Sequence, residues 1–195
     1  MSLPIYIARH GQTAWNAVAR VQGQAEADLN ENGRRQAAVN GRTLARLIPD
    51  PSSFRFIASP MRRTRETMEI IRETMGLPRD GYELEPRIVE VHLGDWQGFT
   101  FAELEAAEPG STATRDLDKW NFVPPGEAAE SYAVLAERIR PWFAELEGPA
   151  VIVTHGGVIR ALFHILNGIS GKEASMMDVA QDRVFEGRGG RIGWI

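Results

Sequence analysis

Short apolar runs rich in β-branched residues alternate with stretches of helical periodicity along this chain. The three clearest runs are residues 5–8, 54–58 and 150–154, and each is followed by a segment whose apolar residues recur at helical spacing. Runs of this length are typical of strands buried on both faces, and parallel strands need crossover connections that are usually helices. The alternation therefore predicts an α/β fold. We expect a three-layer sandwich in which a mostly parallel β-sheet has helices on both faces.

Capping residues indicate where the helices begin. Helices are expected over residues 31–48, 60–75, 131–147 and 157–167. Asn30 is a suitable N-cap for the first, and Ser59 followed by Pro60 should start the second. Pro141 should kink or break the third. A capping box that begins at Thr100 predicts one more short helix.

Two regions near the C-terminal half do not follow the strand–helix alternation. Apolar residues flank Arg188-Gly189-Gly190, which predicts a β-hairpin and makes the sheet mixed. Residues 108–128 form the one long irregular stretch, and a loop of that length in a compact domain is usually functional or mobile, with a structural insertion as the alternative. Arg115, Trp120 and Phe122 in this stretch either contact a substrate or pack the loop down.

The composition is that of an ordinary globular protein. The 195 residues are 43% hydrophobic and 25% charged, which is consistent with one domain over residues 1–195. The absence of cysteine excludes disulfides, Cys-ligated metals and a Cys nucleophile. No apolar run approaches the ~20 residues of a membrane helix. The first residues, Met1-Ser2-Leu3-Pro4, lack signal-peptide features, so we expect a cytoplasmic protein without membrane association.

The charge distribution gives a weaker indication of the partners. The net charge of −4 argues against general nucleic-acid binding. Arginines are concentrated in residues 1–79, whereas acidic residues prevail further along the chain. These arginines either lie on a solvated surface or converge on an anion, for which the planar guanidinium is well suited.

Two of the four histidines, His10 and His155, occur in the same sequence setting. Each follows a predicted strand directly and precedes a glycine, and Arg9 stands before His10. Open α/β sheets bind ligands at the carboxyl ends of their strands, and glycine lets backbone N–H groups approach a ligand closely. The helix that begins after Gly156 and Gly157 would direct its positive N-terminus to the same place. We expect both imidazoles to meet face to face in an arginine-lined site.

Other chemistries lack their sequence patterns. Zinc sites need about three protein ligands, and neither His-x-x-x-His nor His-Glu-x-x-His occurs. A Gly-x-x-x-x-Gly-Lys-Ser/Thr loop and a Gly-x-Ser-x-Gly elbow are also missing. Neutral imidazole can instead attack phosphorus, which requires cations around the phosphoryl group and an acid for the leaving alcohol. This interpretation requires no metal and no cofactor.

The run Ile7-Ala8-Arg9-His10-Gly11-Gln12-Thr13-Ala14-Trp15-Asn16 resembles the signature of the histidine phosphatase superfamily, the phosphoglycerate mutase-like proteins. That signature begins with an apolar residue and any residue, followed by Arg-His-Gly. Glu or Gln comes next, then any three residues, and Asn ends the signature. The resemblance implies a phosphoglycerate mutase-like fold. It also implies that His10 is the phosphorylated nucleophile and that Arg9 and Asn16 contact the phosphoryl group.

Further motifs similar to those of the family follow in order up to residue 160. Arg20-Val21-Gln22-Gly23-Gln24 resembles the phosphate-contacting loop, which implies that Gln22 and Gly23 bind the substrate. Ser59-Pro60-Met61-Arg62-Arg63 resembles a motif whose last arginine, here Arg63, is the second phosphate clamp. The chain has Glu26 where the family usually has Asp, and Asn30 where it usually has Thr.

The last two motifs supply the remaining groups of the site. Glu90-Val91-His92-Leu93-Gly94-Asp95-Trp96-Gln97-Gly98 is similar to the family's acid motif, with Gln97 in place of Glu, and it implies that Glu90 is the proton donor and later the base for water. His155-Gly156-Gly157-Val158-Ile159-Arg160 resembles the second-histidine motif. It implies that His155 donates to phosphoryl oxygens beside the N–H of Gly156. His92 and His164 match no catalytic position.

The resemblance allows three functions on this fold. A phosphatase hydrolyses a small phosphate monoester through phosphorylated His10, a phosphoglycerate mutase returns the phosphoryl group to another hydroxyl, and a silent module only binds phosphate or a phosphopeptide. Mutases of the family usually carry an added segment over the site, and the short stretch from Gln97 to Ser131 favours hydrolysis. Residues 124–131 resemble the family's Pro-Pro-Gly-Gly-Glu-Ser motif with extra residues, which affects the leaving-group pocket. A homodimer through the C-terminal hairpin is possible.

Overall fold

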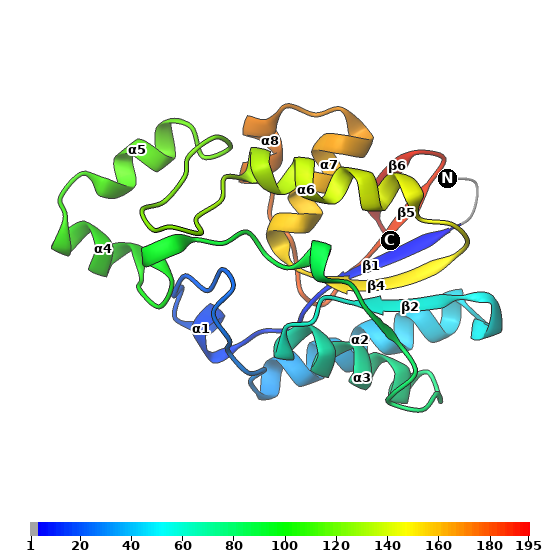
Figure 1. Cartoon of the computed structure of the whole chain (residues 1–195). Coiled ribbons are helices and arrows are strands. Elements are labelled where there is room, and N and C mark those ends of the chain that lie inside the picture. Colours follow the sequence, from blue (N-terminus) through cyan, green and yellow to red (C-terminus); the bar gives the residue numbers. More distant parts are fainter. Residues whose placement is uncertain (1–3) are drawn as a thin grey trace.

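A six-stranded sheet organises the chain (Figure 1). The computed structural model describes residues 4–195, so the prediction about a signal peptide falls largely outside the described residues. The strands lie in the order β3-β2-β4-β1-β5-β6. Their bounds are β1 Ile5–Arg9, β2 Arg55–Ala58, β3 Glu83–Leu84, β4 Ala150–Thr154, β5 Val184–Arg188 and β6 Arg191–Trp194. The pairs among β1, β2, β3 and β4 are parallel, and β5 joins β1 and β6 antiparallel, so the sheet is mixed as predicted.

The helices cover both faces of this sheet. They are α1 Ala14–Ala17, α2 Glu31–Leu47, α3 Arg62–Thr74, α4 Phe101–Ala107, α5 Ser111–Leu117, α6 Tyr132–Glu145, α7 Gly156–Asn167 and α8 Gly171–Met176. Short 3-10 helices are η1 Pro51–Ser53, η2 Pro86–Ile88 and η3 Gly94–Trp96. In Figure 1, α2 and α3 lie below the sheet, whereas α6, α7 and α8 lie above it. None of the helices within residues 4–195 has the length and apolarity needed to span a membrane.

Alternate residues of the central strands supply two separate cores. Ile5 and Ile7 of β1 pack with residues of α6 and α7, such as Leu135 and Leu162. Tyr6 and Ala8 face the other way, toward α2 and α3. Successive side chains of a strand point to opposite faces, so a strand without polar alternation must be covered on both sides. The predicted three-layer arrangement is therefore confirmed.

The start of α3 differs from the prediction. Ser59 does not cap the helix, which begins at Arg62 after an N-cap position held by Met61 without a side-chain hydrogen bond. The carboxylate of Glu26 instead accepts a hydrogen bond from the backbone N–H of Arg62, with N···O distances of 3.1 and 3.3 Å to its two oxygens. Ser59 directs its hydroxyl toward His155, so a residue that local sequence identifies as a cap belongs to a longer-range contact.

Two further predictions need correction, and two short elements were not predicted. Residues 108–128 are not wholly irregular, because α5 lies within them. Pro141 does not break α6, which continues past it to Glu145. The two-residue strand β3 and the short helix α8 were not predicted, since both are too short for hydrophobic periodicity to indicate them. The predicted caps at Asn30 and Thr100 are confirmed.

Candidate active site

The register of two parallel strands brings the histidines together. Arg9 at the end of β1 lies opposite Thr154 at the end of β4, so His10 and His155 are the next residues on adjacent strands. The backbone N–H of His10 donates to the carbonyl oxygen of Thr154 at 2.9 Å. The two ring centroids are 5.3 Å apart with 61° between the planes. The imidazoles therefore meet as predicted, but edge to face rather than face to face.

His10 is held with one ring nitrogen free. Its Nδ1 lies 2.8 Å from the carbonyl oxygen of Gly11, which only accepts, so Nδ1 carries the hydrogen and Nε2 keeps its lone pair. A backbone carbonyl thus fixes the orientation of the ring. Burial, with the guanidiniums of Arg63 and Arg9, lowers the pKa of His10 well below its usual value. The ring is consequently neutral at physiological pH, as a nucleophile must be.

Gly11 allows the loop after His10 to pack tightly. A Cβ at this position would lie 2.2 Å from the carbonyl oxygen of Gly33 in α2. The N–H of Gly11 also donates to the hydroxyl of Thr67 in α3 at 3.1 Å. The loop that carries His10 is therefore fixed against both α2 and α3.

Arg9 and Arg63 line one cavity of about 430 Å³ together with His10. Arg63 is 1% exposed, and its Nη1 and Nη2 donate to the carbonyl oxygens of Ala25 and Gly23 at 2.9 and 2.7 Å. Arg9 donates from Nη1 to the carbonyl of Val179 at 2.8 Å. Burial lowers the pKa of Arg63 to about 10 and also lowers that of Arg9. Both remain charged and are oriented by backbone acceptors.

His155 lies next to His10 and is fully buried. Its Nε2 is 2.8 Å from the hydroxyl oxygen of Ser59, and its Nδ1 has no partner among residues 4–195. If the Ser59 hydroxyl donates to Nε2, Nδ1 bears the hydrogen and is available as a donor. Burial lowers the pKa of His155 well below its usual value, with smaller effects of Arg63, His10 and Arg9 in the same direction.

Glu90 reaches the site from the loop after η2. Its two carboxylate oxygens accept from the N–H of Gly157, in the first turn of α7, at 3.0 and 3.2 Å. The N–H of Val91 donates to the same carboxylate at 3.0 Å. An N-terminal helix turn favours negative charge, so the carboxylate is oriented by a backbone group 67 residues away. Glu90 lines the cavity together with His10.

The four predicted substrate-binding residues differ in their positions. Asn16, Gln22 and Gly23 line the cavity, whereas Gly156 and the catalytic candidate His155 do not. The amide oxygen of Asn16 accepts from the side chain of Gln181 at 3.1 Å. Gln22 is buried, and its amide oxygen lacks a hydrogen-bond partner within the described part of the chain. Gly156 has its backbone beside Arg9, where a Cβ would lie 3.4 Å from the Nε atom.

Sequence reasoning missed several residues of the cavity wall. Arg20, Lys119, Tyr132 and Arg160 line it, and Arg115 lines it too. Of these cations, the sequence interpretation names only Arg115 as a candidate substrate contact, and the aromatic residues near it pack the loop. Trp120 stacks on Tyr132 at 6.0 Å, and Phe122 lies 5.0 Å from Trp96. Arg20 and Arg160 stand within motifs that resemble those of the family, but the resemblance implied no role for either, and Lys119 lies in a segment without a motif.

The structure gives no indication of a metal centre in its described residues. Within residues 4–195, no three His, Cys, Asp or Glu side chains gather in a way that could hold a metal ion. The site instead combines a neutral imidazole, two buried guanidiniums and a carboxylate around one cavity. This arrangement suits a phosphoryl group, whose oxygens need fixed positive donors.

The comparisons with known proteins agree with this site. Residues 5–188 match the family model of the histidine phosphatase superfamily (branch 1), and the chain belongs to this superfamily. Glucosyl-3-phosphoglycerate phosphatase of Mycolicibacterium vanbaalenii is 36% identical over 178 residues, which is 85% of this chain and 74% of that protein. The metal-independent phosphoserine phosphatase of Arabidopsis thaliana is 34% identical over 164 residues, 82% of this chain and 66% of that protein.

The solved structures extend the similarity to three dimensions. Mycobacterial glucosyl-3-phosphoglycerate phosphatase in complex with VO3 has a TM-score of 0.82 at 30% identity, covering 100% of this chain and 98% of the other. Proteins named probable phosphoglycerate mutase are among the relatives as well. The chain is thus a phosphoglycerate mutase-like protein of the phosphatase kind, and its enzyme class is that of the phosphoric monoester hydrolases.

Replacing Gly157 with alanine should lower activity without unfolding the protein. The new Cβ would lie 2.2 Å from Oε1 of Glu90, which must then move, and a carboxylate at the end of a side chain moves at little cost in stability. We expect kcat to fall by about ten-fold or more while the melting temperature changes by only a few degrees. Steady-state kinetics and thermal unfolding of the variant measure the two quantities. An unchanged kcat would show that the position of Glu90 does not limit the reaction.

Proposed function

We propose that the protein hydrolyses a small phosphate monoester whose alcohol part carries a second anionic group, with His10 as the nucleophile. Its membership among the phosphatases of the superfamily supports the reaction class. The roles of Arg9, Arg63, His155 and Glu90, and the nature of the alcohol, are our proposals. They rest on the contacts of these side chains.

One observation carries the proposal. Among the described residues, the buried side-chain polar atoms without a partner are Arg9 Nε, Gln22 Oε1, Asn40 Oδ1, Arg63 Nε and His155 Nδ1. All but Asn40 belong to predicted residues of this site. Leaving a buried donor without an acceptor costs about 1–3 kcal/mol, so several such donors around one imidazole favour a bound anion. Exchange of the amide atoms would make Gln22 a donor too.

In the proposed first step, Nε2 of His10 attacks the phosphorus of the bound monoester. The bond from phosphorus to the alcohol oxygen breaks, and Glu90 donates a proton to that oxygen. Arg9, Arg63 and His155 hold the phosphoryl oxygens and stabilise the charge on them. In the second step Glu90 takes a proton from water, whose oxygen attacks the phosphorus and releases His10 and inorganic phosphate. These residues perform both steps with the protein's own side chains, and we expect a chelator to leave the rate unchanged.

Two further cations of the cavity lining support a second anionic group in the substrate. Lys119 and Arg160 line the cavity and donate to the backbone carbonyls of Ser175 and Met177 at 2.6 and 2.9 Å. Neither is in an ion pair with a carboxylate of the described residues, whereas Arg115 beside them pairs with Asp116 at 2.6 Å. Glucosyl-3-phosphoglycerate and phosphoserine, the compounds in the relatives' names, both carry a carboxylate on the alcohol part.

Phosphate release from a set of matched compounds tests the proposal. The set pairs 3-phosphoglycerate, phosphoserine and glucosyl-3-phosphoglycerate with phosphate monoesters of neutral alcohols of similar size. We expect higher kcat/KM for the carboxylate-bearing members. A preference for neutral alcohols contradicts the second anion, and absence of release from every member contradicts hydrolysis. The same samples reveal a mutase, since it would interconvert 3- and 2-phosphoglycerate with little release of phosphate.

Lys119 gives the second anion site a pH dependence. Burial, with Arg160 and Arg115, lowers the pKa of Lys119 to about 8. The ammonium is charged below that pH and neutral above it, so KM for a carboxylate-bearing substrate should rise as pH increases through about 8. Lys119→Met should raise this KM by about ten-fold at neutral pH and remove the rise. Lys172→Met, which replaces the exposed second lysine of the chain, should change neither. Equal KM values for Lys119→Met and the unmodified protein would contradict the assignment.

Three predictions about the whole protein remain proposals. A single sheet with strands from Ile5 to Trp194 supports one domain. The strand β6 is at the sheet edge, where a second copy could pair with it in a homodimer, and light scattering of the purified protein measures the mass. The cytoplasmic location is an expectation for cell fractionation to check.

A further inference from the structure

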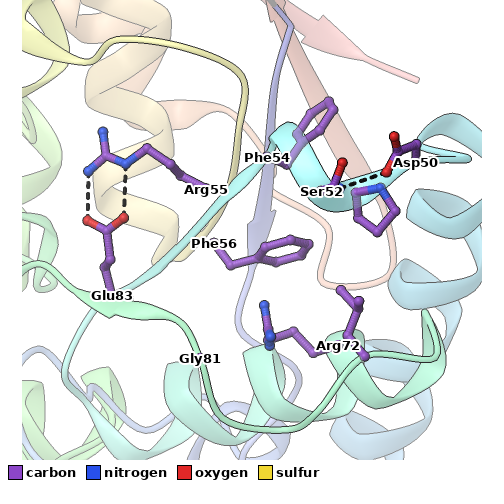
Figure 2. Close-up of a pocket in the computed structure, with 10 residues that line it drawn as sticks. Asp50, Ser52, Phe54, Arg55, Phe56, Arg72, Gly81 and Glu83 are labelled. Atoms are coloured by element: carbon purple, nitrogen blue, oxygen red, sulfur yellow. Dashed lines mark hydrogen bonds and ion pairs between the residues drawn. The ribbon is translucent and has the colours of Figure 1, made fainter.

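A second cavity lies beside the start of β2, whereas the candidate active site lies at the carboxyl ends of β1 and β4. Its volume is about 470 Å³, and its walls come from η1, β2, α3 and the chain around Gly81 and Glu83 (Figure 2). The strand β2 starts here at Arg55 and ends at Ala58, directly before Ser59 of the active site. The two cavities share no lining residue, so they are separate. A volume of this size is in the range of small-molecule sites.

Arg72 is the central charged group of this cavity. It is 7% exposed, and its guanidinium carbon lies 4.6 Å from the centre of the Phe56 ring. Figure 2 shows the side chain extending from α3 toward Phe56, beneath the part of the cavity that Phe54 and Ser52 border. Its Nε donates to the carbonyl oxygen of Pro78 at 2.9 Å. The described residues provide no acceptor for the two Nη nitrogens.

The other charges of the cavity already have partners. Arg55 and Glu83 form two parallel hydrogen bonds of 2.9 and 2.7 Å, which are drawn in Figure 2. The carboxylate of Asp50 accepts from the backbone N–H of Ser52 at 3.0 Å. Asp80 is near enough to raise the pKa of Arg72, but burial outweighs it and lowers that pKa. Arg72 is thus a buried cation without a carboxylate in ion-pair contact among residues 4–195.

The remaining wall of the cavity is apolar and includes two aromatic rings. Phe54, Phe56 and Leu77 line it, and Phe54 stacks on Tyr6 behind it with ring centroids 6.0 Å apart. Gly81 lies next to the guanidinium, where a Cβ would be 3.1 Å from Nη2 of Arg72. The glycine therefore leaves space beside the Nη edge, from which a guanidinium can donate two parallel hydrogen bonds to one carboxylate.

We propose that this cavity is a binding site for a small anion with a flat apolar body, in which Arg72 binds a carboxylate and Phe54, Phe56 and Leu77 contact the body. The carboxylate supplies the acceptors that the Nη nitrogens lack. The body removes apolar surface of the cavity from water. This site is independent of the proposed function, because it shares no lining residue with the cavity around His10.

The experiment uses 2-naphthoate as the probe and 2-naphthamide as its uncharged match. Both are titrated into the isotope-labelled protein with saturating inorganic phosphate, which keeps the active site occupied. We expect 2-naphthoate to shift amide signals of residues 50–56 and 77–83, with affinity at least ten-fold higher than that of 2-naphthamide. Arg72→Gln removes the cation, and Ser52→Trp fills the opening of the cavity. Each should weaken the binding of 2-naphthoate at least ten-fold. Arg79→Gln removes a nearby exposed arginine that pairs with Glu73, and it should bind as the unmodified protein does.

Several results would overturn the site. Absence of shifts at the solubility limit, equal affinity for naphthamide, or shifts centred on residues 9–23 each contradict it. Arg72→Gln can also disturb the chain near Pro78, so its melting temperature is measured. Ser52→Trp changes an exposed residue and keeps the test decisive if Arg72→Gln does not fold. If the Ser52→Trp protein folds and binds 2-naphthoate as tightly as the unmodified protein does, the proposed location of the site is wrong.

Discussion

Replacing His10 with alanine should lower kcat/KM for every phosphate monoester by at least about 10³-fold, or about 4 kcal/mol. The reason is geometric: Nδ1 is committed to the Gly11 carbonyl, and Nε2 is the free nitrogen of the ring beside Arg9 and Arg63. The unmodified protein is mixed with a substrate that is labelled in its phosphoryl group, and the reaction is quenched in alkali. The quenched protein should carry the label on His10. The variant should contain none. Steady-state phosphate release measures the rate.

Two other histidine variants provide controls for this prediction. His155→Ala should be slower than the unmodified protein but should still become labelled on His10, since it retains the nucleophile. His164→Ala should keep most of the activity, because the ring of His164 packs on Trp120 at 4.7 Å and lies outside the cavity lining. Full turnover by His10→Ala, or label on another residue, would falsify the assignment of the nucleophile.

Glu90→Gln should slow hydrolysis most for substrates whose alcohol must be protonated in order to leave. General acid catalysis contributes about 10²–10⁴-fold, so hydrolysis of alkyl phosphates such as phosphoserine should fall by that factor. An aryl phosphate with a nitrophenol leaving group departs without protonation, so its first step should be far less affected. The measurement is the ratio of kcat/KM for the two kinds of substrate in each protein.

The size of this ratio separates the possible roles of Glu90. Glutamine preserves an acceptor for the Gly157 N–H but cannot supply the proton, so positioning is largely maintained. Equal losses for both substrates would indicate that Glu90 only positions other groups. Unchanged kcat/KM for both substrates would show that Glu90 takes no part in the mechanism. Glu127→Gln, at an exposed residue of the neighbouring loop, is the matched control and should leave both rates unchanged.

Much of the fold was predictable because local patterns and tertiary packing agree. The runs at residues 5–8 and 150–154 are apolar on both faces, and the structure buries them between two layers. The meeting of His10 with His155 follows from the rule that ligands bind at the carboxyl ends of parallel strands. The resemblance of the motifs then assigned Glu90, which no spacing argument could select among 26 acidic residues.

The remaining features depend on contacts between distant parts of the chain. Ser59 has the appearance of a helix cap, yet its hydroxyl contacts a histidine 96 residues away. Lys119 belongs to a segment without clear periodicity, and only the folded chain places it beside Arg160 on the cavity wall. Arg72 occurs on a helix with several other arginines, and its burial against Phe56 is decided by the loop that passes over it.

The position of β1 between β4 and β5 has a consequence for how the protein forms during synthesis. Both neighbours of this first strand come from residues 150–188, so β1 must wait for most of the chain to leave the ribosome before it can pair. Closing such a long loop is slow compared with forming local contacts. His10 precedes both neighbours of β1, and the lining of its pocket extends to Arg160, so the pocket is complete only after β4 and the start of α7 have been synthesised. Until β4 has been synthesised, the apolar strand β1 lacks a partner strand, and unpaired apolar strands are prone to aggregate.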